Sequence, residues 1–107
     1  FGLTEKAATE YGYSVKVGKF PFAASGKAQA IGDTEGMVKI VAAKESGEIL
    51  GVHMIGPEVT EMLGEMSLVQ LLEGTVDEVG WLVHSHPTLS EVLKEAALAA
   101  DGKAIHI

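Results

Sequence analysis

The clearest pattern of hydrophobic and polar positions along the chain is a pair of apolar segments, residues 37–43 and 48–55. Within each segment, successive side chains fall on alternate faces, which is the periodicity of a β-strand. The polar stretch between the segments ends in Gly47, a residue that can adopt the positive φ of a tight turn. The pattern therefore predicts a β-hairpin.

The second strand of this hairpin is apolar on both of its predicted faces. One face carries Leu50, Val52 and Met54, and the other carries Ile49, Gly51, His53 and Ile55. Because a strand covered on both faces is typical of the middle of a sheet, we predict a central position for it. His53 is interpreted as a core or interface histidine whose ring is hydrogen-bonded.

The longest predicted helix begins at Pro57, since proline is favoured at the first helical position, and it ends at Gly74. Its core stripe has the spacing of an amphipathic helix and consists of Val59, Met62, Leu63, Met66 and Val69. A second apolar set on the opposite side consists of Leu68, Leu71 and Leu72. A second apolar face indicates a partner, and the alternative of a helix enclosed within one domain stays open.

Shorter patterns complete the predicted fold. They are a helix over 4–11 that Gly12 ends, a strand over 13–22 with Pro21 at its end or edge, a helix that starts with a capping box at 75–78, and an alanine-rich helix over 89–100. Together these elements predict one α+β domain over residues 1–107. We expect an antiparallel sheet of about three to five strands with helices packed mainly on one face.

The composition excludes several classes of function. The 107 residues carry a net charge of −7, and all eight basic residues are lysines. This acidic balance argues against binding to nucleic acid or to anionic membranes, and no apolar run is long enough to span a bilayer. The chain has no cysteine, which excludes thiol chemistry on its own residues and fits a reducing compartment.

The strongest chemical signal is the segment from His84 to Glu91, which reads HSHPTLSE. Thr88 can cap a helix with Glu91 at the reciprocal position of a capping box. Pro87 favours an extended backbone at His86, so the imidazole is expected beside the helix start. Because helical side chains lean toward the N-terminus, Glu91 leans toward His86, as in an oriented general acid/base. Capping alone also explains Glu91, and His86 as a surface residue is the alternative.

Other chemistry in this segment has weaker support. His84 and His86 have a His-x-His spacing, but no third ligand lies at a suitable spacing, so we predict no metal site. Ser85 and Ser90 do not sit in a nucleophile-elbow pattern, which argues against a serine hydrolase. Trp81 lies near the histidines in the sequence, and it either shields their site or fills an interface.

Several segments resemble the C-terminal interface domain of the dihydrolipoamide dehydrogenase family of flavin disulfide reductases. They are residues 1–5, 17–24, 36–40, 49–53 and 84–91, which read FGLTE, VGKFPFAA, GMVKI, ILGVH and HSHPTLSE. The resemblance implies that His86 is the acid/base and that Glu91 orients it. It also implies that His86 and Pro87 lie near the flavin of the other subunit of a homodimer.

The resemblance further implies FAD and NAD in the full-length enzyme, although none is expected on this chain. It implies as partners the lipoyl domains of 2-oxo acid dehydrogenase complexes or of the glycine cleavage system. The implied location is the cytoplasm, or the mitochondrial matrix in a eukaryote. In such an enzyme the base takes a proton from dihydrolipoamide, so that a thiolate can attack a redox-active disulfide.

The parts that such an enzyme needs are not all encoded here. No Gly-x-Gly-x-x-Gly segment opens a βαβ unit, and the redox cysteines are absent. Phe1 stands where a start methionine would be, so we expect a piece of a longer chain that is inactive alone; a processed N-terminus is the alternative. The competing function is a free-standing homodimeric binding or assembly module without catalysis.

Overall fold

The computed structural model describes residues 1–25, 27, 32, 36–56, 59–82, 84 and 88–102. Its centre is a three-stranded antiparallel sheet in the order β1-β2-β3. The strands are β1 (Val15–Pro21), β2 (Met37–Ala43) and β3 (Ile49–Ile55). The predicted α+β class, strand number and hairpin are confirmed, and Gly47 in the hairpin turn has a φ of +76°.

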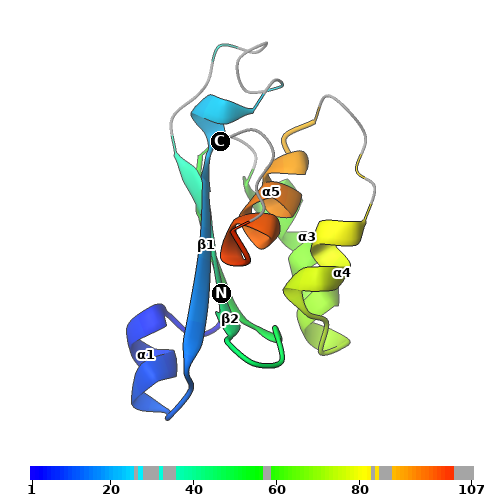
Figure 1. Cartoon of the computed structure of the whole chain (residues 1–107). Helices are drawn as coiled ribbons and strands as arrows, with labels where there is room; N and C mark the ends of the chain where they lie inside the picture. Colours follow the sequence, from blue (N-terminus) through cyan, green and yellow to red (C-terminus); the bar gives the residue numbers. More distant parts are fainter. Residues whose placement is uncertain are drawn as a thin grey trace.

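The described helices cover the two faces of the sheet unequally. They are α1 (Glu5–Glu10), the short 3-10 helix η1 (Phe22–Ala24), α3 (Val59–Leu71), α4 (Val76–Trp81) and α5 (Glu91–Ala100). Figure 1 shows α3, α4 and α5 on one side of the sheet and the small helix α1 on the other. The prediction of helices mainly on one face is therefore confirmed. None of these described helices is both long and apolar enough to cross a membrane.

Two hydrophobic clusters of different size lie on the two faces. The larger cluster joins the sheet to α3, α4 and α5, and its largest fully buried members include Phe20, Phe22, Ile40, Met66 and Leu93. The smaller cluster, under α1, has Ala8, Val41 and Leu50 as its buried members. Because each fully buried large apolar side chain contributes roughly 1.5–3 kcal/mol, the three-helix side supplies most of the stability of the described fold.

A β-bulge changes the predicted faces of β3. Val41 pairs with Gly51 and Ala42 pairs with Ile49, so Leu50 has no partner on β2. The extra residue reverses the alternation of side chains. Ile49 therefore belongs to the larger cluster and Leu50 to the smaller one. The prediction that Leu50 shares a face with the apolar residues that follow it was wrong for this reason.

The predicted central position of β3 was also wrong, because β2 is the middle strand. The outer edge of β3 is instead covered by residues Phe1–Leu3, with Gly2 bridged to Gly51 in antiparallel fashion. A side chain at Gly51 would stand 1.9 Å from the Leu3 carbonyl oxygen, so only glycine permits this approach. Nε2 of His53 lies 3.0 Å from the same oxygen, which confirms a hydrogen-bonded histidine.

The end of α3 differs in detail from the predicted stop at Gly74. The left-handed residue is Glu73, with a φ of +57°. The Glu73 N–H donates to the Gln70 carbonyl at 3.0 Å, and the Gly74 N–H donates to the Val69 carbonyl at 2.8 Å. This is the Schellman pattern, in which glycine is the usual left-handed residue. Gly74 is needed for space instead, since a Cβ there would lie 2.7 Å from Cγ1 of Val69.

Small residues hold α5 close to β1. A Cβ at Gly18 would lie 1.9 Å from the Ala96 carbonyl oxygen, so the helix backbone packs directly on the strand. Beyond this contact, Lys16 Nζ lies 2.6 Å from an oxygen of Asp101 at the end of α5. The alanine-rich inner face of α5 thus permits the close packing that the sequence indicated, and it fixes the helix whose first residue is Glu91.

Candidate functional site

The site predicted at the start of α5 is described only in part. Glu91 is the first residue of α5, and Thr88 precedes it by three positions. The other predicted site residues, His86 and Pro87, lie outside the described residues. The proposed contact between His86 and Glu91 therefore stays a prediction.

The carboxylate of Glu91 is held by the backbone that leads into the helix. The Thr88 N–H donates to Oε1 of Glu91 at 2.9 Å, which is one half of the predicted capping box. After Thr88 the chain forms tight turns over residues 89–93, because Val92 donates to the Leu89 carbonyl and Leu93 donates to the Ser90 carbonyl, each at 3.0 Å. Regular α5 consequently begins at Glu91 rather than at Leu89 as predicted.

The chemistry of Glu91 follows from this placement. A carboxylate has two oxygens that can accept hydrogen bonds. One oxygen holds the Thr88 N–H, which fixes the orientation of the group. His86 is two residues before Thr88 in the sequence.

A second histidine–carboxylate pair lies beside this segment, and sequence reasoning missed it. Nε2 of His84 lies 2.8 Å from Oε2 of Glu65 on α3. The His84 side chain is only 6% exposed and that of Glu65 is 23% exposed. The two residues are 19 positions apart, a separation that no local pattern connects.

The pair changes the protonation of His84. The hydrogen bond from Nε2 to the Glu65 carboxylate raises the pKa of His84 above its usual value, and the negative charge of Glu65 acts in the same direction. Burial and the positive charge of Lys94 on α5 oppose this shift. Nδ1 of His84 is buried without a hydrogen-bond partner among the described residues. Through these interactions the imidazole is coupled to both α3 and α5.

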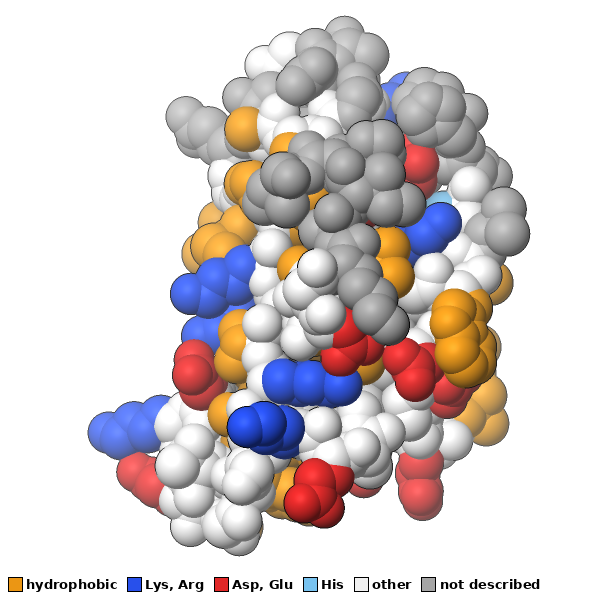
Figure 2. All heavy atoms as spheres, in the orientation of Figure 1, with side chains coloured by type: hydrophobic (Ala, Val, Ile, Leu, Met, Phe, Trp, Pro, Cys, Tyr) orange, Lys and Arg blue, Asp and Glu red, His pale blue; other side chains and the backbone are white. Residues whose placement is uncertain are grey.

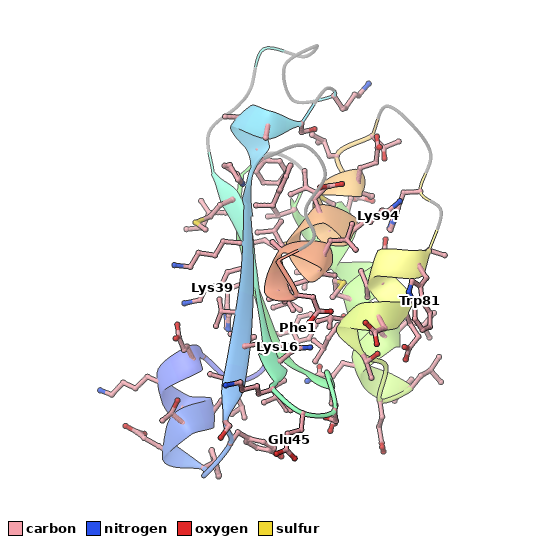
Figure 3. All side chains as sticks on the ribbon, viewed as in Figure 1. Phe1, Lys16, Lys39, Glu45, Trp81 and Lys94 are labelled. Carbon is pink, nitrogen blue, oxygen red and sulfur yellow. The ribbon has the colours of Figure 1, made fainter. Side chains whose placement is uncertain are left out.

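A large apolar surface lies next to these groups on α3 and α4. About half or more of each of its side chains is exposed. The members are Leu68, Leu71, Leu72, Trp81 and Leu82. Trp81 is 73% exposed and points away from the fold (Figure 3), so it does not shield a site within the described chain. Figure 2 shows hydrophobic side chains at the surface on this side of the molecule. The second apolar face predicted for α3 is therefore present and uncovered.

The described residues offer no phosphate cradle for a dinucleotide. Every strand pairing in the described sheet is antiparallel, whereas such cradles join a parallel strand to a helix N-terminus through a glycine-rich turn. No cluster of three or more potential metal ligands occurs among the described side chains. Among the described residues, therefore, titratable side chains and exposed apolar side chains are present, and a glycine-rich dinucleotide cradle is not.

Comparison with known proteins agrees with this arrangement. A family model described as "Pyridine nucleotide-disulphide oxidoreductase, dimerisation domain" matches residues 1–97. A dihydrolipoyl dehydrogenase of Bacillus subtilis is 59% identical over 105 residues, which cover 98% of this chain and 22% of that protein. A dihydrolipoyl dehydrogenase of Thermus scotoductus is 49% identical over 106 residues, or 99% of this chain and 23% of that protein.

A solved structure shows the same fold. The HOCl-induced flavoprotein disulfide reductase RclA from Escherichia coli superposes with a TM-score of 0.85 and 26% sequence identity. The superposition covers 90% of this chain and 22% of that one. In each of these comparisons, the present chain spans about a fifth of the length of its relative.

Proposed function

Because this chain belongs to the family of pyridine nucleotide-disulphide oxidoreductase dimerisation domains, we propose that it is the dimerisation domain of a dihydrolipoyl dehydrogenase. In this proposal it supplies the acid/base His86, oriented by Glu91, to the active site of the partner subunit. The observation that most strongly supports this proposal is the match of nearly the whole chain to dihydrolipoyl dehydrogenases at up to 59% identity. The hydrogen bond that fixes Glu91 at the start of α5 supports the role of that carboxylate.

The chemistry of the proposed base is a proton transfer that enables thiol–disulfide exchange. His86 accepts the proton of one thiol of dihydrolipoamide, and the thiolate attacks a disulfide of the partner subunit to form a mixed disulfide. The second thiol of the substrate then closes the lipoamide ring and releases the enzyme dithiol. The substrate loses two electrons and the enzyme disulfide gains them. Since this chain has no cysteine, the disulfide belongs to another part of the enzyme.

The remaining parts of the reaction are also supplied from outside the described residues. FAD and NAD, held by other domains, provide the onward two-electron transfer in the complete enzyme. We place the substrate on lipoyl domains of 2-oxo acid dehydrogenase complexes or of the glycine cleavage system, in the cytoplasm or mitochondrial matrix. Glu91 contributes by holding the imidazole in one orientation and by stabilising its protonated form.

The test is a chimera in which this chain replaces the matching C-terminal segment of the Bacillus subtilis relative. We expect lipoamide-dependent reduction of NAD, and a loss of about 10²–10⁴ in kcat for His86→Ala, as removal of a general base predicts. NADH oxidation with ferricyanide, which needs flavin but no thiol base, serves as the control and should be unchanged. Lipoamide turnover that survives His86→Ala would overturn the proposed base.

The proposed dimer uses the uncovered apolar surface of α3 and α4. A second copy would bury this surface by two-fold pairing, in which the same patch serves on both subunits. We expect sedimentation of the chimera to show a dimer, and Leu68→Asp combined with Leu72→Asp to shift it toward monomer. As a matched control, Lys6→Asp on α1 changes charge on the opposite side of the sheet and should leave the dimer intact.

A free-standing assembly module without catalysis is the second candidate. The exposed side chains of Leu71 and Trp81, at 79% and 73%, favour association whether or not chemistry follows. The two candidates differ in the chimera, because an assembly module would give a dimer in which His86→Ala has no effect. The reading frame upstream of Phe1 also separates them, since a dehydrogenase requires paired cysteines and a glycine-rich βαβ unit there.

A further inference from the structure

The part-buried pair of His84 and Glu65 adjoins the proposed base in the sequence, since His84 precedes His86 by two positions. His84 follows α4 and Glu65 lies in the middle of α3, so their 2.8 Å contact ties two helical elements at one point. The mechanism proposed above assigns them no proton transfer. Their chemistry therefore needs a separate explanation.

A histidine–carboxylate pair with little solvent exposure is an energetically costly contact between two elements, because both groups lose hydration. Burying the imidazole and part of the carboxylate removes hydration from both, and a well-packed apolar contact at the same place is often as stable or more stable. A charged hydrogen bond differs from an apolar contact in fixing distance and direction, because it weakens steeply away from its preferred geometry. The 6% exposure of His84 also restricts the motion of its ring. The pair is thus suited to fixing a position precisely.

The position that it fixes is one end of the segment that contains His86. The other end is Thr88, whose N–H is held by Glu91 at 2.9 Å. Only residues 85–87 separate the two anchors, and four Cα–Cα steps of about 3.8 Å limit their span to about 15 Å. In the sequence, His84 stands two positions before His86 and Thr88 stands two positions after it.

We propose that the His84–Glu65 pair anchors the approach to His86, so that His84 and Glu65 are positioning residues for the acid/base reaction. This inference rests on the proposed function, since it presupposes that His86 is the base. Removing one anchor lets the base move, and errors of about 1 Å in a catalytic group can cost up to about 10² in rate. We expect the loss for one of two anchors to be about tenfold in kcat.

The test uses the chimera with His84→Ala, Glu65→Ala and both changes together. We expect each to lower kcat for dihydrolipoamide about tenfold, with the KM for NAD unchanged. The double variant should be no slower than either single variant, because each removes the same contact. Additive losses would show that the two residues act independently and would overturn the proposal.

A second background separates positioning from general structural support. In a His86→Ala chimera the base is absent, so His84→Ala should cause no further fall in the residual rate. A structural role would still lower activity in that background, and such a result would overturn the positioning role. If His86→Ala itself is harmless, the proposed function fails; if it is harmful while His84→Ala leaves kcat unchanged, only the positioning role fails.

Conservative and control variants complete the design. His84→Gln places an amide N–H near the position of Nε2 and can still donate to Glu65, so it should recover most of the kcat lost in His84→Ala. Glu61→Ala removes an exposed carboxylate from the same helix and should match the unmodified chimera. If His84→Gln were as slow as His84→Ala despite equal melting temperatures, the hydrogen bond could not be the positioning element.

Discussion

The starts of α4 and α5 carry the same Thr-x-x-Glu pattern but use it differently. At α4, Thr75 donates to Glu78 through its backbone N–H at 3.1 Å and through its hydroxyl at 2.6 Å, and the helix begins at the next residue. At α5, Glu91 accepts from the Thr88 N–H, and the helix begins three residues later. Glu78 is exposed, whereas Glu91 is half-buried.

The difference lies in what each glutamate carboxylate binds. Both oxygens of Glu78 bind the residue that caps its helix, which completes a capping box on the surface. At α5, Oε1 of Glu91 accepts from the Thr88 N–H, and a tight turn separates Thr88 from the regular helix. A capping pattern therefore marks a helix start in both places, and the residues before it distinguish the two.

The largest expected effect is on turnover. Glu91→Gln in the chimera should lower kcat about ten- to hundredfold, because a neutral amide stabilises protonated His86 less than a carboxylate does. Glu78→Gln is the matched control and should leave kcat unchanged. Steady-state kinetics with dihydrolipoamide would measure both variants. Equal effects of the two substitutions would remove the functional distinction between the two helix starts.

A smaller effect is expected on stability at α4. Thr75→Ala removes the hydroxyl that donates to Glu78 and accepts from the Asp77 N–H, so we expect a loss of about 1 kcal/mol in the free energy of unfolding. Chemical denaturation of this chain would measure it. The same substitution in the chimera should not change kcat at temperatures well below melting. A fall in turnover comparable to that of Glu91→Gln would contradict a purely structural role for the α4 cap.

The smallest expected effects concern how the stability contributed by each region depends on pH. Hydrogen bonds from Thr75 lower the pKa of Glu78, so its stabilising contribution is present above its unfolded pKa of about 4.5 and is lost as pH falls through the lower folded value. Near α5 the hydrogen bond to Glu65 raises the pKa of His84, so that contribution is present below about 6.5 and is lost as pH rises through the folded value.

Melting temperature measured across pH would reveal both dependences. In a plot of melting temperature against pH, Glu78→Gln should reduce the pH dependence on the acid side only. His84→Gln should reduce it only above about pH 6.5. The positive charge of Lys94 lowers the pKa of His84, opposing Glu65. Lys94→Gln should therefore raise that pKa further, so that the stability contributed by His84 persists to higher pH. If His84→Gln left the upper side unchanged, the pH dependence would have to come from another group.

Local patterns predicted the elements well and the long-range contacts poorly. The alternation of residues 37–43 and 48–55 gave the hairpin, and the Thr75–Glu78 spacing gave a complete capping box. The bulge at Leu50 and the edge position of β3 depend on pairing partners, which periodicity does not contain. The bond between Glu65 and His84 joins residues 19 positions apart, so only the folded chain brings them together.

For the candidate site, the spacing from Thr88 to Glu91 was enough to anticipate the anchored carboxylate, because capping is a local interaction. The spacing did not anticipate the turn that delays the start of α5. The contact of His86 with Glu91 remains a prediction from the sequence and from the resemblance. The positioning pair was accessible only through tertiary structure, because a lone glutamate in a helix carries no sign of its distant partner.

The pairing of Phe1–Leu3 along β3 has a consequence for how copies of this domain can associate. An open strand edge presents unpaired N–H and C=O groups and invites another chain to extend the sheet, which is a route to fibrous aggregation. Here Leu3 donates to the Leu50 carbonyl and Val52 donates to the Phe1 carbonyl, each at 2.9 Å, so that stretch of β3 is already occupied. Sheet extension along those residues is therefore closed.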